Sequence, residues 1–192
     1  MNGCDSVEKV TLNKTTLSGN ANGGAIFAGP VRALILESKF LSNMSAGIFF
    51  ADAQTTKNLI FSTLITGTKV NPNPPSGVDP VGLADGVLVL KSATVTILAS
   101  SILNNQRAGV IVSGGTSEAK TGVTNVNFNR FGVVWNDNAT YVDLGGCDIS
   151  ANTVQNFLTD GDLPVPSEPM DVPCIDDATC ASGVCVGGVC AE

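Results

Sequence analysis

Several side chains on which protein chemistry often depends are scarce or missing from this sequence. Histidine is absent, which excludes imidazole general bases, Ser-His-Asp and Cys-His nucleophilic systems and histidine-ligated metals. No apolar run reaches the roughly 18 residues that a transmembrane helix needs, and no charged segment followed by an apolar one opens the chain as a signal peptide would. We therefore expect neither a membrane span nor an active site built on histidine.

Charge is also sparse, and positive charge most of all. Charged residues make up 14% of the 192 residues, with ten Lys and Arg against seventeen Asp and Glu and a formal net charge of −7. The basic residues are scattered, so nucleic acids and anionic membranes are unsuitable partners. Hydrophobic residues make up 43% and the mean hydropathy is +0.25, which excludes charge-driven disorder. A chain of this length holds one ordinary domain and a short appendage.

Cysteine is concentrated at one end of the chain. Four of the six cysteines crowd into the last nineteen residues, as Cys174, Cys180, Cys185 and Cys190. This cluster predicts a disulfide-bonded tail; the alternative is a four-cysteine zinc knuckle, which favours closer C-x2-C pairs. Disulfides persist outside the cytoplasm, so we expect a secreted or cell-surface protein. We also expect the chain to be a processed piece of a longer exported protein, with residues needed for activity outside it.

A repeat of 23 residues organises most of the chain. A glycine followed by an apolar strand recurs with steps of 23, 39, 23 and 23 residues, at Gly24, Gly47, Gly86, Gly109 and Gly132. The step of 39 contains the Pro-rich segment 69–80, which is typical of a loop insertion. Removing its 16-residue excess restores the period, so the sequence predicts stacked structural repeats.

Each copy also carries three expected core positions with the spacing i, i+2 and i+7. Alternation at i and i+2 with many β-branched residues is typical of a strand. The six sets are Val10/Leu12/Leu17, Ala33/Ile35/Phe40, Asn58/Ile60/Ile65, Val95/Ile97/Ile102, Thr121/Val123/Phe128 and Val142/Leu144/Ile149. An Asn follows three residues after the last core position in four copies, at Asn20, Asn43, Asn105 and Asn152. Because Asn tolerates left-handed backbone angles and its amide can stack on the next copy, we expect an asparagine ladder.

This pattern resembles a known family. Three short strands and three turns per copy suit a parallel β-solenoid, and the repeated N-x-T-I-x-x-S-x-I-x-x-N pattern resembles the right-handed parallel β-helix of the pectate-lyase-like superfamily. The resemblance implies an all-β fold of about six 23-residue coils over residues 1–158. Residues 159–173, which contain four Pro, predict a semi-rigid linker. The tail, 174–192, resembles short Cys-rich modules on exported proteins of myxobacteria-like bacteria.

One strand of each copy carries an apolar residue that we expect to point outward. The alternation gives a column along the sheet: Ile26, Phe49, Leu88, Ile111 and Val134. Such a stripe is larger than scattered surface hydrophobes would make. We expect the Pro-rich insertion, a neighbouring loop or the tail to cover it; the alternative is an interface with a partner or with a second copy of the chain. The matching column of the first strand is mixed and expected to be solvated: Thr11, Leu34, Leu59, Thr96, Gly122 and Asp143.

The resemblance also draws attention to charged residues, because superfamily enzymes that cleave acidic polysaccharides use Asp clusters for Ca²⁺ with an Arg or Lys base. Asp137, Asp143 and Asp148 share the sixth copy and are the catalytic candidates. Arg107 and Arg130 stand one copy apart, and two stacked guanidinium groups could grip a carboxylate or sulfate of a sugar chain. The alternative, which we favour, is that these are solvated turn residues.

Two short acidic motifs raise the question of calcium. They are Asp160-Gly-Asp162 and Asp176-Asp177, and neither matches an EF-hand loop or a Gly-Gly-x-Gly-x-Asp repeat. We therefore expect no cofactor and no metal site, with Ca²⁺ as the alternative.

The fold is thus predicted more sharply than the function. The repeat is complete and assembles no catalytic set, so we expect a non-catalytic exported scaffold or binding module, with a polysaccharide or a cell-surface protein as its partner. The alternative is a fragment of a polysaccharide lyase or glycoside hydrolase of the same superfamily, with catalytic coils partly outside this chain. The superfamily hosts both kinds of protein, so the resemblance does not decide between them.

Overall fold

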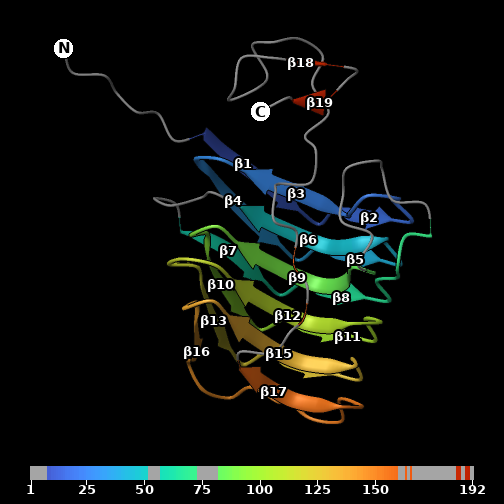
Figure 1. The fold of residues 1–192 in the computed structure, drawn as a ribbon, viewed down its shortest axis with the longest axis vertical. Helices are drawn as coiled ribbons and strands as arrows, with labels where there is room; N and C mark the ends of the chain where they lie inside the picture. Colours follow the sequence, from blue (N-terminus) through green and yellow to red (C-terminus); the bar gives the residue numbers. More distant parts are fainter. Residues whose placement is uncertain are drawn as a thin grey trace, which may run out of the picture. The chain divides into compact units, whose positions relative to one another are not determined.

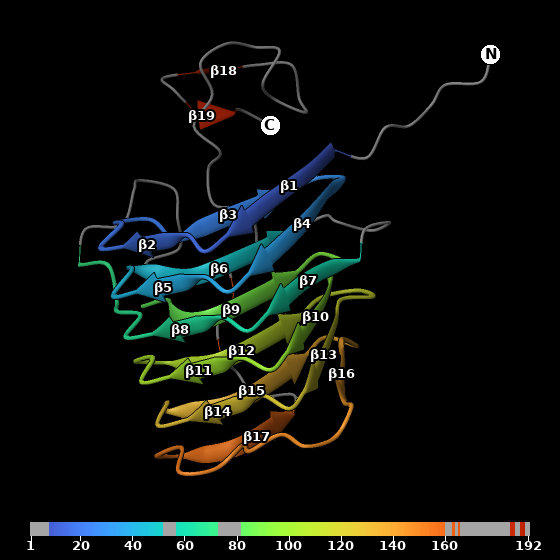
Figure 2. The same cartoon turned by 180° about the vertical axis from the view of Figure 1, so that it is seen from behind.

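The chain winds through three parallel β-sheets as a solenoid. The computed structural model describes residues 8–51, 57–72, 82–159, 163 and 165, and the backbone of 185–186 and 189–190. The first five coils pass through the three sheets in turn and the sixth adds strands to sheets A and C, so that every strand of the solenoid pairs with a strand one coil away (Figures 1 and 2). The prediction of an all-β solenoid with about six coils is confirmed.

Each sheet takes one strand from successive coils. Sheet A contains β1 (Glu8–Asn13), β4 (Val31–Leu36), β7 (Asn58–Phe61), β10 (Thr94–Leu98), β13 (Glu118–Gly122) and β16 (Thr140–Asp143). Sheet B contains β2 (Thr16–Ser18), β5 (Lys39–Leu41), β8 (Leu64–Thr66), β11 (Ser101–Leu103) and β14 (Asn125–Asn127). Sheet C contains β3 (Ala25–Ala28), β6 (Ser45–Ala51), β9 (Ala84–Leu90), β12 (Ala108–Ser113), β15 (Phe131–Asn136) and β17 (Gln155–Thr159).

Neighbouring coils pair in register, so equivalent residues stack in columns. Val10 lies beside Ala33 in sheet A, and Phe40 lies beside Ile65 in sheet B. Inward side chains of the three sheets meet in one apolar core. The largest fully buried ones are Phe40, Phe50, Ile35, Ile48, Ile60, Ile65, Ile97 and Ile102. Isoleucine is common at these inward positions because its β-branched side chain favours the strand conformation and also fills the space between the sheets.

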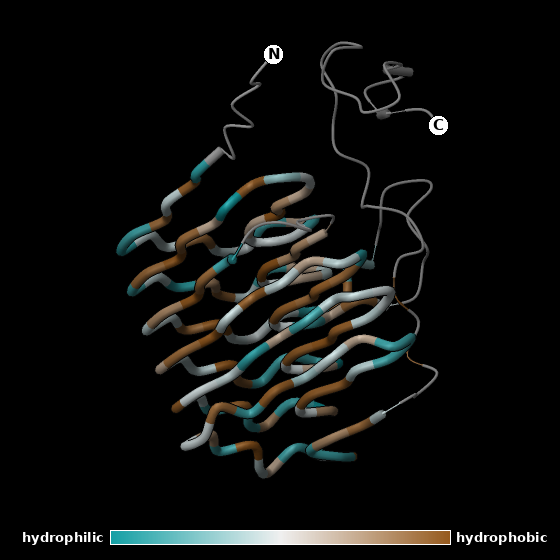
Figure 3. The backbone as a smooth tube through the Cα atoms, turned by 90° about the vertical axis from the view of Figure 1, so that its left-hand side faces the viewer, coloured by the Kyte–Doolittle hydropathy of each residue, from teal (hydrophilic) through white to brown (hydrophobic). Residues whose placement is uncertain are grey.

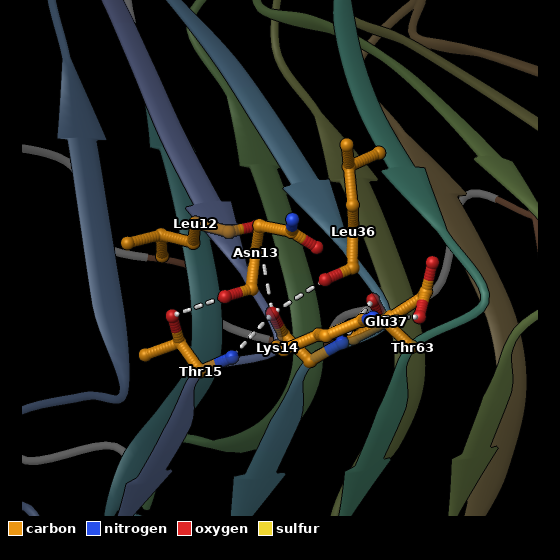
Figure 4. A network of polar contacts seen from close by, with 8 residues as sticks. Leu12, Asn13, Lys14, Thr15, Leu36, Glu37 and Thr63 are labelled. Carbon is orange, nitrogen blue, oxygen red and sulfur yellow. Dashed lines mark hydrogen bonds and ion pairs between the residues drawn. The ribbon is translucent and has the colours of Figure 1, made fainter.

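Two corners of each coil are turned by a single residue in the left-handed backbone region. The corner between sheets A and B uses Lys14, Glu37, Ser62, Ala99, Val123 and Gly146, with φ from 47° to 72°. The corner between sheets B and C uses Gly19, Ser42, Gly67, Asn104, Phe128 and Ala151, with φ from 51° to 70°. Figure 4 shows two stacked corners of the first kind, where the Lys14 N–H donates to the Leu36 carbonyl at 3.0 Å.

The fifth coil lies two residues away from its predicted register. Its inward residues are Ala119, Thr121 and Val126, which are all fully buried. Val123 and Phe128, predicted to be core, are 68% and 57% exposed because they occupy the two left-handed corners. The prediction was wrong here because it took two exposed apolar corner residues for core residues and passed over a buried alanine.

The sixth coil departs from its predicted register by one residue in sheet A. Tyr141 stacks beside Ala119 and packs against the core, whereas Leu144 is 54% exposed. Ile149 packs against the core, as predicted. The outward column of sheet A that begins at Thr11 therefore ends in Lys120 and Val142 rather than in Gly122 and Asp143.

The chain divides into two compact units, 1–72 with 82–163, and 73–81 with 164–192. The first is the solenoid. In the second, the described backbone forms an antiparallel pair, β18 (Cys185–Val186) and β19 (Val189–Cys190), which places Cys185 opposite Cys190. Within the described residues, no helix is long and apolar enough to cross a membrane.

Candidate functional site

The predicted asparagines lie at the corner between sheets B and C, directly after the left-handed residue. Asn20 donates to Asn43 Oδ1 twice, from Nδ2 at 2.9 Å and from its backbone N–H at 3.1 Å. Asn105 makes the same two bonds to Asn129 Oδ1, both at 2.9 Å, and Asn129 makes them to Asn152 at 3.1 and 3.0 Å. The side-chain amides therefore link coils in the way that backbone amides link strands.

In the third coil a threonine replaces the asparagine of the ladder. Thr68 stands at the ladder position there, and its backbone N–H donates to Asn105 Oδ1 at 3.1 Å. Its hydroxyl is buried and has no hydrogen-bond partner among the described residues. A buried unpaired hydroxyl destabilises a fold by about 1–3 kcal/mol. This weak step comes one residue before the Pro-rich segment 69–80 begins.

A column of glycines leaves room for the asparagine amides. A Cβ on Gly109 would lie 2.9 Å from Asn129 Nδ2, 2.8 Å from the Gly132 carbonyl oxygen and 2.3 Å from Val126 Cγ1. Gly24 and Gly132 meet the same three kinds of neighbour at similar distances. The repeated glycine of the sequence thus serves close approach between coils rather than backbone flexibility, because no left-handed φ is found at these positions.

A second polar ladder lies at the corner between sheets A and B. Its members are a threonine or serine in successive coils: Thr15, Ser38, Thr63, Ser100 and Thr124. The Thr15 N–H donates to Ser38 Oγ at 3.1 Å, and the Thr63 N–H donates to Ser100 Oγ at 3.1 Å. These hydroxyls, apart from that of Thr15, belong to buried residues. Sequence reasoning missed this ladder, although each member follows the middle core position of its coil by three residues.

Arg107 does not stack on Arg130 as a pair of solvated guanidinium groups. It is only 8% exposed and forms a bidentate ion pair with the fully buried Asp85, with Nε–Oδ1 and Nη2–Oδ2 distances of 2.9 and 2.5 Å. The Ala108 N–H also donates to Asp85 Oδ1 at 3.1 Å. Burial raises the pKa of the Asp85 carboxyl above its usual value, and the Arg107 guanidinium opposes that rise. Arg130 is exposed, and its Cζ lies 5.5 Å from the centroid of the Phe131 ring.

The three acidic candidates do not share one coil, because Asp137 ends the fifth coil and Asp143 and Asp148 lie in the sixth. Asp137 follows β15 and accepts from Ser113 Oγ at 2.7 Å. Asp143 ends β16 and accepts from the Gly145 N–H at 2.7 Å. Asp148 bridges to sheet B, where Asn127 Nδ2 donates to it at 2.8 Å.

Each of these carboxylates therefore organises a local turn or a strand end. Hydrogen bonds from Ser150 and Asn127 lower the pKa of Asp148, which keeps this exposed group ionised. The described residues contain no group of three or more His, Cys, Asp or Glu side chains that could hold a metal ion.

The predicted apolar stripe forms a single column of sheet C. Ile26, Phe49, Leu88, Ile111 and Val134 are successive neighbours in the register, and Leu158 continues the column. Ile26 is 39% exposed, but the four central members are 0% exposed, although they lie outside the apolar core of the solenoid. Both faces of sheet C are thus buried around these residues, and the stripe is not an open surface.

An aromatic cluster occupies the fifth and sixth coils. The Trp135 ring stacks on Tyr141, with centroids 5.6 Å apart, and Phe157 lies 6.3 and 6.1 Å from the two rings. Burial raises the pKa of Tyr141 to about 12, while its hydrogen bond with Thr121 acts in the opposite sense. Cys147, which is half-buried and not in a disulfide, lies 3.4 Å from Thr121 Oγ1.

Several predictions fall outside the described residues. They concern the side chains of Cys174, Cys180, Cys185 and Cys190, the acidic residues Asp160, Asp162, Asp176 and Asp177, and most of the Pro-rich insertion. The disulfide, calcium and covering-loop predictions therefore stay predictions.

The comparison with protein families agrees with this geometry. The family described as the right handed beta helix region matches residues 1–163. The chain belongs to this family. Searches of curated proteins and of solved structures found no match. The right-handed β-helix is thus identified through its repeat, its sheets and its family, and this membership carries no activity of its own.

Three residues of this β-helix could have been found from the sequence with a better alignment. Asn129 was missed because the fifth coil was placed two residues late, which put Phe131 at the ladder position. Asn156 was missed because it lies in the same coil as its donor: Asn152 Nδ2 donates to Asn156 Oδ1 at 3.0 Å. Asp85 gave a clear signal, since it is an acidic residue directly before a repeat glycine in an apolar strand.

Proposed function

We propose that this β-helix is a non-catalytic binding module of an exported protein, with a polysaccharide or a cell-surface protein as its partner. The observation that carries the proposal is the use that the solenoid makes of its charged side chains. Asp85 and Arg107 neutralise each other inside the fold, and Asp137, Asp143 and Asp148 each stabilise a separate turn or strand end. Groups engaged in this way support a rigid surface rather than an acid–base pair.

Arg130 is the accessible member of the two predicted ligand-binding arginines. Its guanidinium is exposed beside Phe131, and a guanidinium next to an aromatic ring suits a carboxylate or sulfate on a sugar chain. The finer relationship, to the pectate-lyase-like superfamily, and the export of the chain support the same proposal and rest on the sequence pattern alone.

Native electrophoresis through gels cast with acidic or neutral polysaccharides, with and without Ca²⁺, tests the proposal. We expect retardation in an acidic gel without cleared zones when the polysaccharide is stained. The Arg130→Gln variant should be retarded less, and Lys39→Gln, which removes an exposed charge in sheet B, should behave as the parent does. Cleared zones would instead establish the polysaccharide lyase or hydrolase alternative. Free migration in every gel would contradict glycan binding and leave a protein partner to be sought.

A further inference from the structure

The outer face of sheet A carries an apolar column that the solenoid leaves partly open. One outward column runs through Leu36, Phe61, Leu98, Gly122 and Leu144, of which Phe61 and Leu144 are 42% and 54% exposed. The adjacent column is mixed, with half-buried Leu34, Leu59 and Val142 beside Thr11, Thr96 and Lys120. Figure 3 views the solenoid from the side on which Figure 1 places sheet A, and hydrophobic segments recur along its strands. Exposed apolar columns of this length mark interaction surfaces.

We propose that this face of sheet A is the contact between two copies of the chain, related by a two-fold axis parallel to the strands. Such an axis preserves the strand direction and reverses the order of the coils. The second coil of one copy then faces the fifth coil of the other, and the third coil faces the fourth. Residues at equal strand positions face each other.

The apolar positions are complementary to one another under this symmetry. Phe61 of the third coil faces Leu98 of the second copy, and this contact occurs twice. Leu36 of the second coil faces Gly122, which has no side chain and lies between Leu98 and Leu144. A Cβ at Gly122 would be 3.0 Å from Leu98 Cδ2 and 3.3 Å from Leu144 Cβ. Because Gly122 is itself buried, Leu36 of the second copy packs on the Leu98 and Leu144 side chains that cover this position.

The charges at the edge of the face are complementary as well. Lys9 and Arg32 are stacked neighbours at the starts of β1 and β4, whereas Glu118 stands at the start of β13. The two-fold axis brings Arg32 opposite Glu118, again twice. Within one copy, Glu118 forms an ion pair with Lys120 at 2.9 Å. The Glu118 carboxylate can also accept a hydrogen bond from Arg32 of the second copy. The aliphatic part of Lys120 then covers Leu34 of the second copy.

The area of this face indicates how tightly we expect the two copies to bind. Six strands about 4.8 Å apart, each with about five residues rising 3.3 Å, cover roughly 400 Å² per copy. Two such faces bury on the order of 1,000 Å² of accessible surface, the lower end for specific interfaces. The dimer should therefore be reversible, with a dissociation constant on the order of micromolar. This inference goes beyond the proposed function, because it needs no glycan and leaves Arg130 free.

Sedimentation equilibrium of the full chain, over two orders of magnitude in protein concentration, tests the proposal. The parent should show a monomer–dimer equilibrium. Phe61→Lys places a charge close to the axis in both copies and should weaken the dimer by a factor of about ten or more. Arg32→Glu and Glu118→Arg should each weaken it, and the double variant should regain most of the parent affinity. Lys39→Glu, an equal charge reversal on sheet B, should leave the dissociation constant unchanged.

The outcomes that overturn the proposal are distinct from those that bear on glycan binding. A parent that stays monomeric at every concentration would refute it. A dissociation constant that neither Phe61→Lys nor Arg32→Glu changes would place the interface elsewhere. If Arg32→Glu and Glu118→Arg each weaken the dimer and the double variant does not regain affinity, the pairing of Arg32 with Glu118 is refuted. Circular dichroism and urea titration of each variant verify that the solenoid is folded. The retardation assay is separate, so a failed dimer leaves the proposed function as it stands.

Discussion

Sheets A and C belong to the same repeat, yet their outer faces have different environments. In sheet A, burial alternates along β4 and β10, so outward Leu34 and Leu98 remain half-buried. In sheet C, every residue of β6, β9 and β12 is buried. Parallel strands that are buried on both faces read as continuous apolar runs. The strands of sheet C read in this way, and those of sheet A alternate more.

The difference teaches that hydropathy and alternation tell which way a side chain points, but not what it meets there. Leu59 in sheet A and Leu88 in sheet C are both outward leucines, and only Leu88 is withdrawn completely from solvent. An outward column can therefore be a second interior or an open surface. Paired substitutions in the two sheets should separate these cases, because equal chemical changes should have unequal effects.

The largest contrast should come from the two ion pairs. Asp85→Ala leaves Arg107 charged and without its bidentate partner inside the fold, which should lower the free energy of unfolding by about 3–5 kcal/mol. Glu118→Ala removes the partner of Lys120 in a partly exposed pair of sheet A and should cost less than about 1 kcal/mol. Urea titration at a low protein concentration measures both. Similar small losses would mean that the Asp85 site is open to water in solution.

The outer columns themselves provide the next test. Ile111→Ala should destabilise the solenoid by about 2–4 kcal/mol, because Ile111 is fully buried and its removal leaves a cavity. Leu59→Ala, on the half-buried face of sheet A, should lower the free energy of unfolding by about 1 kcal/mol or less, because the Leu59 side chain buries less apolar area than that of Ile111. The measurement is again the free energy of unfolding in urea. Equal effects would show that the stripe of sheet C is as accessible as sheet A.

Glycine-to-alanine changes should sharpen the comparison at a smaller scale. Gly109→Ala forces a Cβ against Val126, the Gly132 carbonyl and the Asn129 amide, which should destabilise the fold by about 1–3 kcal/mol. Gly122→Ala places its Cβ 3.0 Å from the flexible end of Leu98 and 3.3 Å from Leu144 Cβ, without a backbone contact, and should cost less, about 1 kcal/mol. Thermal unfolding followed by circular dichroism reports both. A Gly109→Ala protein as stable as Gly122→Ala would contradict the close packing of coils at the asparagine ladder.

The smallest effect should be a dependence on alkaline pH. The pKa of Tyr141 is raised from 10.0 to about 12 in the folded protein, so the folded state favours the neutral phenol. The resulting stabilisation is complete below about pH 10 and is lost as the pH rises from there toward about 12. Tyr141→Phe should therefore weaken the pH dependence of the unfolding free energy in this window. An unchanged profile in the variant would mean that the Tyr141 hydroxyl is solvated.

The repeat made most of the fold predictable, because one periodic pattern specified strands, corners and register together. Gly24 to Gly132 gave the coil length, and the columns of Ile35 and Ile97 gave the inward face. The prediction of core residues failed in the fifth coil, where the apolar Val123 and Phe128 occupy exposed corners instead of inward strand positions. These two corners adopt left-handed backbone angles without a glycine or asparagine, so nothing in the sequence marked them as corners.

The candidate site was less predictable because its chemistry depends on contacts between coils. The spacing of Arg107 and Arg130 was read from the sequence, but Asp85, which precedes a repeat glycine in the copy adjacent to Arg107, was passed over as its partner. Spacing alone also brought Asp137, Asp143 and Asp148 together in one coil. Three corners of a coil face different directions, so closeness in sequence did not become closeness in space.

The corner after Thr68 has a consequence for how the protein can be altered. Lys69 still forms a parallel bridge with Met44, and the Val70 N–H donates to Gln106 Oε1 at 2.9 Å, while on the other side of the insertion Ala84 pairs with Ser45. Residues on either side of the insertion thus maintain the stacking, and the repeat does not specify the length of the segment between them. A foreign peptide that replaces residues 73–81 would therefore keep every pairing described on either side of the insertion.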